Sequence, residues 1–445
     1  MHFKEPINVL YLHFMERKIE SELLEWKNST LRMPLVLHGA RQVGKTFVVK
    51  KFASKHYMNF VYLNFEANMR LQAVFAKDLS PARILSELSV LMGVAIHEHT
   101  TLVFFDEIQV SERALTSLKY FCEESPNYHI IAAGSLLGVA LHRGQYSFPV
   151  GKVVLKMLYP FDFEEFLWAI ASKDAATIIR DCYNNNDACS LHEHFSEQFK
   201  MYLCLGGMPN VINTYLKTNS YDEAAAVQRN IIDSYIADMA KYAVPTDTVK
   251  IMAAYHSVSS QLAKENKKFQ YKQIKSGARS SQYETSIDWL CASGIVTKCM
   301  KINQGYYPLS VFSEPSFFKI YMGDVGLLSS KLGIAAQLIL SESMEMNFFK
   351  GSLIENYIAN SLVCNGFDCY YWESEGKAEV DFVIQTKDGK CIPIEVKSSD
   401  NVRSKSLNQY IMKYKPAYSI RISTKNFGFE NKIKSIPHYA SFCIK

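Results

Sequence analysis

The stretch Gly39-Ala-Arg-Gln-Val-Gly-Lys-Thr46 decides the fold of the N-terminal part of this chain. It follows the apolar run 35–37 and precedes a helix-compatible segment, 47–56. Glycines let the backbone curl so that its N–H groups face phosphate oxygens, and the helix that begins there adds its positive dipole end. In this pattern the lysine reaches the β- and γ-phosphates and the threonine hydroxyl ligates Mg²⁺. The stretch predicts a loop for ATP and Mg²⁺ made by Gly39, Ala40, Arg41, Gln42, Val43, Gly44, Lys45 and Thr46.

A second signal predicts that the nucleotide is hydrolysed. The run Thr101-Leu-Val-Phe-Phe105 is apolar throughout, as in a strand covered on both faces, and it ends in Asp106-Glu107. Ligands bind at the carboxyl ends of such strands, so we expect Asp106 to hold Mg²⁺ and Glu107 to activate water. An exposed acidic turn is the alternative. The next apolar strand, 128–134, leads to Ser135, which is predicted to contact the γ-phosphate, although Gly-Ser is equally ordinary in turns.

Strands and helices alternate through this region. A leading helix is expected at 11–28, strands at 35–37, 60–64, 101–105, 128–134 and 153–158, and helices at 47–56, 81–92 and 111–123. Alternation of this kind predicts an α/β fold, with a parallel sheet covered by helices on both faces. The first domain is predicted to span residues 1–166.

Composition excludes several classes of protein. The chain has 445 residues, 48% of them hydrophobic, which is enough for several cores and argues against disorder. The net charge of +5 gives no polybasic tail. Ten cysteines without zinc or disulfide spacing indicate a reducing compartment. With no signal-peptide pattern and no apolar stretch long enough to span a bilayer, we expect a cytoplasmic protein that does not enter membranes.

The middle of the chain is predicted to be helical over 167–245, followed by a winged-helix-like domain over 246–310. Its helices are expected at 249–263, 271–275 and 281–293, and its wing would pair 295–301 with 306–307. Six cations lie where contacts with DNA phosphates would fall: Lys264, Lys267, Lys268, Lys272, Lys275 and Arg279. A winged helix that only packs between domains, with a solvated basic face, is an equal alternative.

Three charged residues near the C-terminus are predicted to share one face of a hairpin. The strands are Val380-Asp-Phe-Val-Ile384 and Cys391-Ile-Pro-Ile-Glu-Val-Lys397. A two-residue turn at Asp388-Gly389 would set Asp381 opposite Val396, on the wrong face. A three-residue loop centred on Gly389 would instead set Asp381 opposite Lys397, and Glu395 shares that face. Asp381 and Glu395 would hold Mg²⁺, and Lys397 would activate water. An inert, charge-paired hairpin face fits the spacing equally well.

Together these motifs resemble the prokaryotic AAA+-like ATPases that carry a C-terminal domain of unknown function with a restriction-endonuclease-like fold. The resemblance extends through Tyr159-Pro-Phe-Asp162, Gly206-Gly-Met-Pro209, Tyr321-Met-Gly-Asp-Val-Gly-Leu327 and Lys350-Gly-Ser-Leu-Ile-Glu355. It implies a P-loop NTPase core of the AAA+/ASCE type, a winged-helix middle, and a PD-(D/E)XK nuclease-like domain over 311–445. In that pattern the metal-site residues are Glu355, Asp381, Glu395 and Lys397.

Two functions fit this organisation. The leading one is an ATPase that acts on double-stranded DNA, with the nuclease-like domain placed on DNA by ATP-driven closure. In a ring or dimer a neighbouring subunit would supply an arginine finger, for which Arg143 is the candidate, although an ordinary surface arginine is the favoured reading. The alternative is a nucleotide-gated signalling switch that binds protein partners and whose C-terminal site is vestigial.

Overall fold

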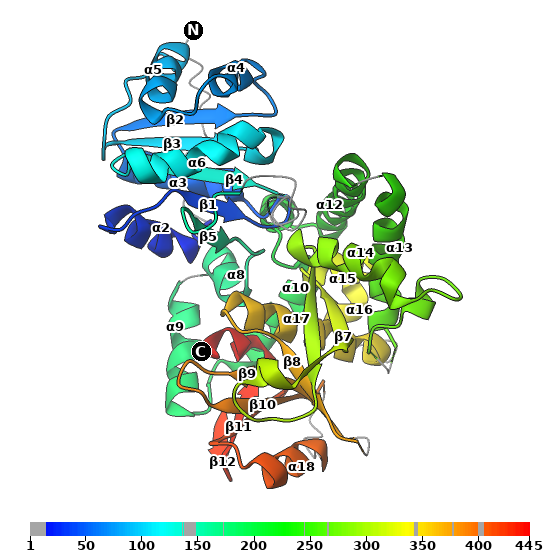
Figure 1. The fold of residues 1–445 in the computed structure, drawn as a ribbon. Coiled ribbons are helices and arrows are strands. Elements are labelled where there is room, and N and C mark those ends of the chain that lie inside the picture. Colours follow the sequence, from blue (N-terminus) through cyan, green and yellow to red (C-terminus); the bar gives the residue numbers. More distant parts are fainter. Residues whose placement is uncertain are drawn as a thin grey trace. The chain divides into compact units, whose positions relative to one another are not determined.

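The computed structural model describes residues 15–135, 137, 148–171, 173–243, 245–264, 267–341, 346–375, 378–398 and 405–445, with the backbone alone at 242, 245 and 346–348. The chain folds into two compact units. The first comprises Met1–Tyr159 with Ala292–Gly294, and the second comprises Pro160–Cys291 and Ile295–Lys445. Figure 1 shows the elements of each unit.

The first unit is a five-stranded parallel sheet between helices, as the alternation predicted. Its strands lie in the order β2-β3-β4-β1-β5, and every neighbouring pair is parallel. The strands are β1 (Leu35–His38), β2 (Asn59–Asn64), β3 (Thr101–Asp106), β4 (His129–Gly134) and β5 (Val154–Met157). The helices are α2 (Ile19–Asn28), α3 (Lys45–His56), α4 (Arg70–Ala76), α5 (Pro81–Met92), η1 (Ile108–Val110) and α6 (Glu112–Glu124).

Alternating side chains of the central strands fill the layers on the two faces of this sheet. One face buries Val36, Val103 and Phe105 in a core with apolar residues of α4, α5 and α6. The helix α3 contacts β2, β3 and β4. Because β3 and β4 are buried at every position, they can carry the uninterrupted apolar runs from which they were predicted.

The second unit begins with helices. They are α8 (Phe163–Ile170), α9 (Lys173–Asn185), α10 (His192–Leu205), α11 (Pro209–Thr218), α12 (Tyr221–Tyr242), α13 (Pro245–Leu262), η2 (Tyr271–Gln273) and α14 (Ser280–Ala292). Later helices are η3 (Leu309–Phe312), α15 (Val325–Lys331), α16 (Ala336–Leu340), α17 (Met346–Cys364), α18 (Lys405–Tyr414) and η4 (His438–Cys443). The predicted helices at 249–263 and 281–293 are therefore present, whereas 271–275 forms only a short 3-10 turn.

A mixed sheet of eight strands runs through the second unit in the order β12-β13-β11-β10-β9-β8-β6-β7. Its strands are β6 (Val296–Ile302), β7 (Ser313–Met322), β8 (Tyr370–Glu373), β9 (Glu379–Gln385), β10 (Cys391–Val396), β11 (Ser419–Ser423), β12 (Gly428–Glu430) and β13 (Ile433–Pro437). The sheet thus includes β6 from the predicted winged-helix segment together with strands of the predicted C-terminal domain.

The predicted wing pairing is wrong. The strand β6 pairs antiparallel with β7, not with residues 306–307, and its other edge pairs with β8. Tyr306 and Tyr307 lie half-exposed in the connecting loop. Residues 306–307 are too few to pair the backbone N–H and C=O groups of the seven-residue strand β6. The strand β7 supplies these hydrogen bonds, and its buried end, Phe318–Met322, adds apolar packing.

Three motifs from distant parts of the chain meet in the second unit. Phe161 donates its N–H to the Gly207 carbonyl over 2.7 Å, and the Asp324 carboxylate accepts the Gly207 N–H over 2.6 Å. A side chain at Gly207 would lie 2.0 Å from the Phe161 carbonyl oxygen. The motifs that begin at Tyr159, Gly206 and Tyr321 therefore form a packing junction.

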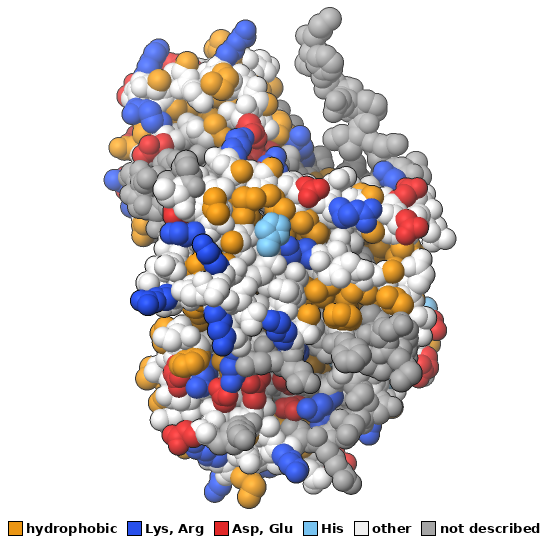
Figure 2. Space-filling model, turned by 90° about the vertical axis from the view of Figure 1, so that its right-hand side faces the viewer, with side chains coloured by type: hydrophobic (Ala, Val, Ile, Leu, Met, Phe, Trp, Pro, Cys, Tyr) orange, Lys and Arg blue, Asp and Glu red, His pale blue; other side chains and the backbone are white. Residues whose placement is uncertain are grey.

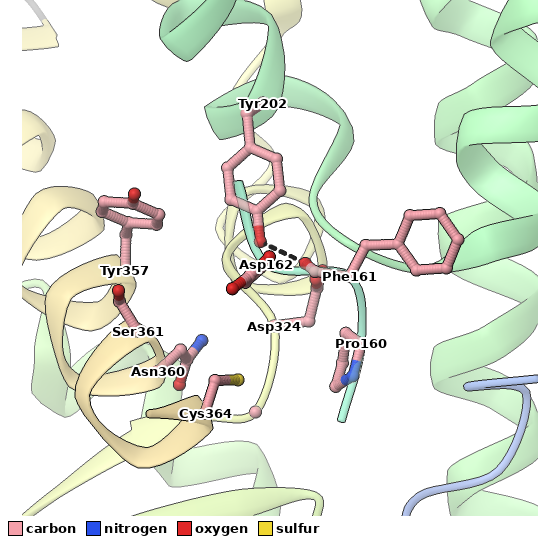
Figure 3. A pocket seen from close by; sticks show the side chains of 10 residues that line it. Pro160, Phe161, Asp162, Tyr202, Asp324, Tyr357, Asn360, Ser361 and Cys364 are labelled. Carbon is pink, nitrogen blue, oxygen red and sulfur yellow. Dashed lines mark hydrogen bonds between the residues drawn. The ribbon is translucent and has the colours of Figure 1, made fainter. Parts of the chain in front are cut away.

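A small cavity lies beside this junction (Figure 3). Its volume is about 10 Å³, the size of one water molecule. Tyr202 donates its hydroxyl to the Phe161 carbonyl across the cavity wall, over 2.6 Å. Burial raises the pKa of Asp324, which lines the cavity, to about 6. The cavity is too small for an organic ligand.

Candidate functional site

The P-loop glycines adopt backbone conformations with positive φ, which glycine tolerates better than other residues. Gly39 has φ +143° and Gly44 has φ +96°, and Gly44 leads directly into α3. A side chain at Gly39 would lie 2.2 Å from the Leu158 carbonyl oxygen, so no larger residue fits. Gln42 is also left-handed, with φ +66°. The loop over residues 39–46 therefore connects β1 to α3 as the pattern predicted.

Lys45 is folded back over its own loop. Its Nζ donates to the carbonyl oxygens of Gly39 and Ala40, each over 2.8 Å, and the residue is 8% exposed. The neighbouring imidazole of His38 stays neutral, because burial and the Lys45 charge lower its pKa to about 4. The ammonium is thus held at the loop, where it can exchange carbonyl partners for phosphate oxygens.

Thr46 and Asp106 meet where a magnesium ion would be needed. The Thr46 hydroxyl donates to Asp106 Oδ2 over 2.9 Å, and Tyr62 donates its hydroxyl to the same oxygen, also over 2.9 Å. A hydroxyl and a carboxylate are hard oxygen ligands, and Mg²⁺ prefers such ligands. The residues therefore fit the ion that the P-loop pattern implies. The role of Tyr62 was not predicted from the sequence. Tyr62 reaches Asp106 because β2 pairs with β3 in a register that sets Asn64, two residues further along β2, beside Asp106.

Glu107 is held just beyond the end of β3 in a left-handed conformation, with φ +53°. Gln109 donates its side-chain amide to Glu107 Oε2 over 2.6 Å. Burial raises the pKa of Glu107, although the Gln109 hydrogen bond opposes the shift. A carboxylate with a raised pKa accepts a proton more readily, which suits a general base. Gln109, a further unanticipated residue, also packs against Gly134.

Ser135 is buried at the end of β4. The strand β4 lies between β1 and β3, so Ser135 follows the strand that separates the P-loop from Asp106. The predicted candidates of the first unit are thus carried by three adjacent strands. Arg143, the candidate arginine finger, lies outside the described residues.

The C-terminal hairpin brings Asp381 and Glu395 together in a register that differs from the prediction. Phe382 pairs with Ile394 in this antiparallel pair of strands, so the next residues along, Asp381 and Glu395, lie opposite each other. Gly389 closes a loop over 387–389 with φ +81°, and it is the last residue of that loop. The predicted loop centred on Gly389, with Asp381 opposite Lys397, is wrong because the left-handed residue stands at the end of the loop.

These three charged groups are nevertheless neighbours. Lys397 Nζ lies 2.6 Å from Glu395 Oε1, while Asp381 Oδ2 accepts the Val396 N–H over 2.8 Å. Burial, together with the charges of Glu355 and Glu395, raises the pKa of Asp381 to about 7. The second oxygen of Glu395 is buried and makes no hydrogen bond. The pair Asp381–Glu395 thus offers oxygen ligands to a cation.

Glu355 is already neutralised by other side chains. It lies on α17, where Lys319 Nζ approaches its Oε1 to 3.1 Å and the Tyr321 hydroxyl donates to the same oxygen over 2.5 Å. Lys267 pairs with its other oxygen. Lys319, 2% exposed, also lies 2.7 Å from Glu379 Oε1. The charges of Lys319 and Lys267 outweigh burial and lower the pKa of Glu355.

The metal set predicted for the C-terminal domain is therefore only partly assembled. Across the described ranges, no three side chains of His, Cys, Asp or Glu are grouped so as to hold a metal ion. Asp381 and Glu395 fit a divalent ion, whereas Glu355 does not, because the Lys319 ammonium supplies its counter-charge. Lys319 could not be anticipated, since it comes from β7, far from the hairpin in sequence.

The six predicted DNA-contacting cations fall into two groups. Lys267 pairs with Glu355 and Lys268 with Glu373, and both lysines are partly buried. The exposed ones are Lys264, Lys272, Lys275 and Arg279. In Figure 2, which shows the side that is on the right in Figure 1, Lys and Arg side chains are scattered among acidic and apolar ones.

Comparison with known proteins bears on each part of the chain. Residues 31–167 match the family model described as an AAA domain. Residues 196–338 and 350–440 match two models described as domains of unknown function, DUF8612 and DUF4143. No curated protein matches the chain.

Among solved structures, the chain is similar to a Walker-type ATPase of Pyrococcus abyssi, with 15% identity, a TM-score of 0.44, and coverage of 72% of this chain and 96% of that one. It is similar to the ORC2 protein of Aeropyrum pernix, with 12% identity, a TM-score of 0.33 and coverage of 76% and 92%. It is also similar to the ORC1 protein of Aeropyrum pernix, solved in complex with DNA, with 11% identity, a TM-score of 0.29 and coverage of 73% and 94%.

The parallel sheet, the P-loop and the carboxylate after β3 define a P-loop NTPase fold for the first unit. The match of residues 31–167 to an AAA domain model agrees with this fold. Among its described helices, none is long and apolar enough to cross a membrane.

Proposed function

We propose that this protein binds ATP with Mg²⁺, hydrolyses it, and uses the cycle to act on double-stranded DNA. The observation that carries the first part is the contact of Thr46 with Asp106 beside the P-loop, which sets two oxygen ligands at one point. Mg²⁺ would neutralise charge on the β- and γ-phosphates when bound there. The protein's own residues supply the rest of the chemistry.

Each residue has a distinct task in this proposal. The N–H groups of the P-loop bind the phosphates, and Lys45 stabilises the charge that develops on the transferred group. Glu107, oriented by Gln109, takes the proton of the attacking water. Ser135 hydrogen-bonds the γ-phosphate from the neighbouring strand. An arginine from a second copy of the chain would complete the site, so the proposal includes a homo-oligomer.

Support for DNA as the target comes from the four exposed cations around η2 and α14. Side chains of this kind neutralise backbone phosphates, and each contact adds about one unit to the salt dependence of binding. Lys267 and Lys268 are left out of the variant tested below, because they are already paired with Glu355 and Glu373.

The test is the rate of ATP hydrolysis with and without duplex DNA, with Glu107→Gln as the blank. We expect DNA to stimulate hydrolysis and to bind with a steep salt dependence. Changing Lys264, Lys272, Lys275 and Arg279 together to Glu should abolish both effects. A control set of Lys413, Lys415 and Lys432, also exposed cations of the second unit, should leave both unchanged when altered to Glu. Hydrolysis that ignores DNA would refute the DNA assignment.

Cleavage of DNA is a separate part of the proposal. Asp381 and Glu395 would hold Mg²⁺, and Lys397, 2.6 Å from Glu395, would orient the attacking water. The assay is plasmid nicking in Mg²⁺ or Mn²⁺, with Asp381→Asn as the control. Intact plasmid in both ions contradicts this part and leaves the ATPase proposal untouched.

One observation favours a second candidate function. Because Lys319 and Lys267 already neutralise Glu355, the C-terminal cluster is held together without a metal ion. A nucleotide-gated switch that binds protein partners needs no nuclease centre. Slow ATP turnover indifferent to DNA, together with intact plasmid, would select this function.

A further inference from the structure

A single buried guanidinium joins the P-loop to the end of the first unit. Arg17 is 5% exposed. Its Nη1 donates to the Val43 carbonyl over 2.8 Å, and its Nη2 donates to the Tyr159 carbonyl over 2.6 Å. Val43 belongs to the P-loop, and Tyr159 is the last residue before the second unit begins at Pro160. Both of these acceptors are backbone carbonyls.

The contact with Val43 determines where one N–H of the P-loop points. In a planar trans peptide, the carbonyl of Val43 and the N–H of Gly44 point in opposite directions. Gly44 has φ +96°, and glycine tolerates several backbone conformations, so this peptide could otherwise rotate at low cost. Arg17 holds the carbonyl on one side, which directs the N–H to the other.

We infer that Arg17 is a positioning residue for nucleotide binding: it holds the Val43–Gly44 peptide so that the Gly44 N–H faces the phosphates. The inference rests on the proposed function, because it concerns the same nucleotide site. A charged donor makes a stronger hydrogen bond to a carbonyl than a neutral one does, and this bond is shielded from water. The ligand concerned is the diphosphate of a nucleotide, whose oxygens the P-loop N–H groups bind.

The segment that leaves the sheet rests against the other end of the same loop. Leu158 donates its N–H to the His38 carbonyl over 2.8 Å, and its own carbonyl fills the space beside Gly39. Residues 158–159 thus touch the P-loop at Gly39 and, through Arg17, at Val43. The same short segment therefore supports both ends of the loop, and all of these contacts lie within the first unit.

The experiment measures the dissociation constant of ADP for the full chain and for three variants. Arg17→Met removes the hydrogen bonds to Val43 and Tyr159. Arg17→Lys keeps the positive charge but has a single donor nitrogen in place of the two that make these bonds. Arg113→Met is the control, because Arg113, although exposed, also donates to two backbone carbonyls of the first unit, those of Phe75 and Lys77. We expect Arg17→Met to weaken ADP binding about tenfold, equivalent to about 1.4 kcal/mol. Arg17→Lys should fall between, and Arg113→Met should bind normally.

A purely structural role predicts a different pattern. Both Met variants should unfold at a lower temperature without ADP, but only Arg17→Met should lose part of the rise in unfolding temperature that ADP produces. If the unaltered protein fails to bind ADP, the proposed function is overturned and this inference with it. If the unaltered protein binds ADP and both Arg17 variants bind it equally well, only the role of Arg17 is overturned. Should Arg17→Met not fold, Arg17→Lys decides the question.

Discussion

The buried lysine of the C-terminal cluster lends itself to a quantitative test. Lys319 lies between Glu355 and Glu379 with its ammonium 3.1 Å and 2.7 Å from their oxygens. Replacing it with Met keeps the apolar stem and removes the charge. Removing one partner of a buried ion pair costs about 3–5 kcal/mol of unfolding free energy, because it leaves an uncompensated charge.

The structure places the expected loss at the lower end of this range. Glu355 keeps Lys267 and the Tyr321 hydroxyl as partners, and the Glu379 side chain is 33% exposed, so water can solvate it. We expect Lys319→Met to lower the unfolding free energy by about 3 kcal/mol. The double variant Lys319→Met with Glu355→Gln should recover part of this loss, since the buried carboxylate of Glu355 is removed with its counter-charge while Lys267 loses its own partner.

Urea denaturation followed by tryptophan fluorescence measures the effect, because Trp168, Trp289 and Trp372 all belong to the second unit. Lys298→Met is the control: Lys298 is on β6, is partly exposed, and lies 3.9 Å from Asp288, a contact worth less than about 1 kcal/mol. If Lys319→Met is no less stable than the control, or if Glu355→Gln fails to restore stability, the account of this cluster is refuted.

Three further predictions follow from the two sites. Gly39→Ala should abolish ATP binding in a fluorescence titration, because the Cβ of the alanine would lie 2.2 Å from the Leu158 carbonyl oxygen. Gly93→Ala, with open space around its Cβ, should bind ATP normally in the same titration. Lys45→Met should weaken ATP binding at least tenfold by loss of one charge-assisted contact, as measured by calorimetry; unchanged affinity would remove Lys45 from the site. The pKa of Asp381 is raised from 3.8 to about 7, so the folded protein favours the neutral form of this side chain. The resulting contribution to the unfolding free energy is complete below pH 3.8 and is lost as the pH rises to about 7. Asp381→Asn should flatten that decline in urea titrations across pH 4–8, and an equal slope in both proteins would contradict the assignment.

Local chemistry made the nucleotide site readable from the sequence. Phosphate binding needs glycines, a lysine and a hydroxyl at fixed spacing within one loop, and the short apolar run 102–105 favours a buried strand for β3. These requirements are satisfied over a few neighbouring residues, so no knowledge of distant contacts was needed. Tyr62 and Gln109 were missed because each acts on a predicted residue, Asp106 or Glu107, rather than on the nucleotide.

The C-terminal cluster shows where that kind of prediction stops. The sequence alone placed Glu395 and Lys397 on one face, since period-two alternation is a property of a single strand, and it predicted Asp381 on the other strand of the hairpin. Tertiary structure decided the register, through the left-handed Gly389 at the end of its loop. It also decided the counter-ions of Glu355, because Lys319 and Lys267 come from other segments of the chain and a buried carboxylate keeps its charge only beside such partners.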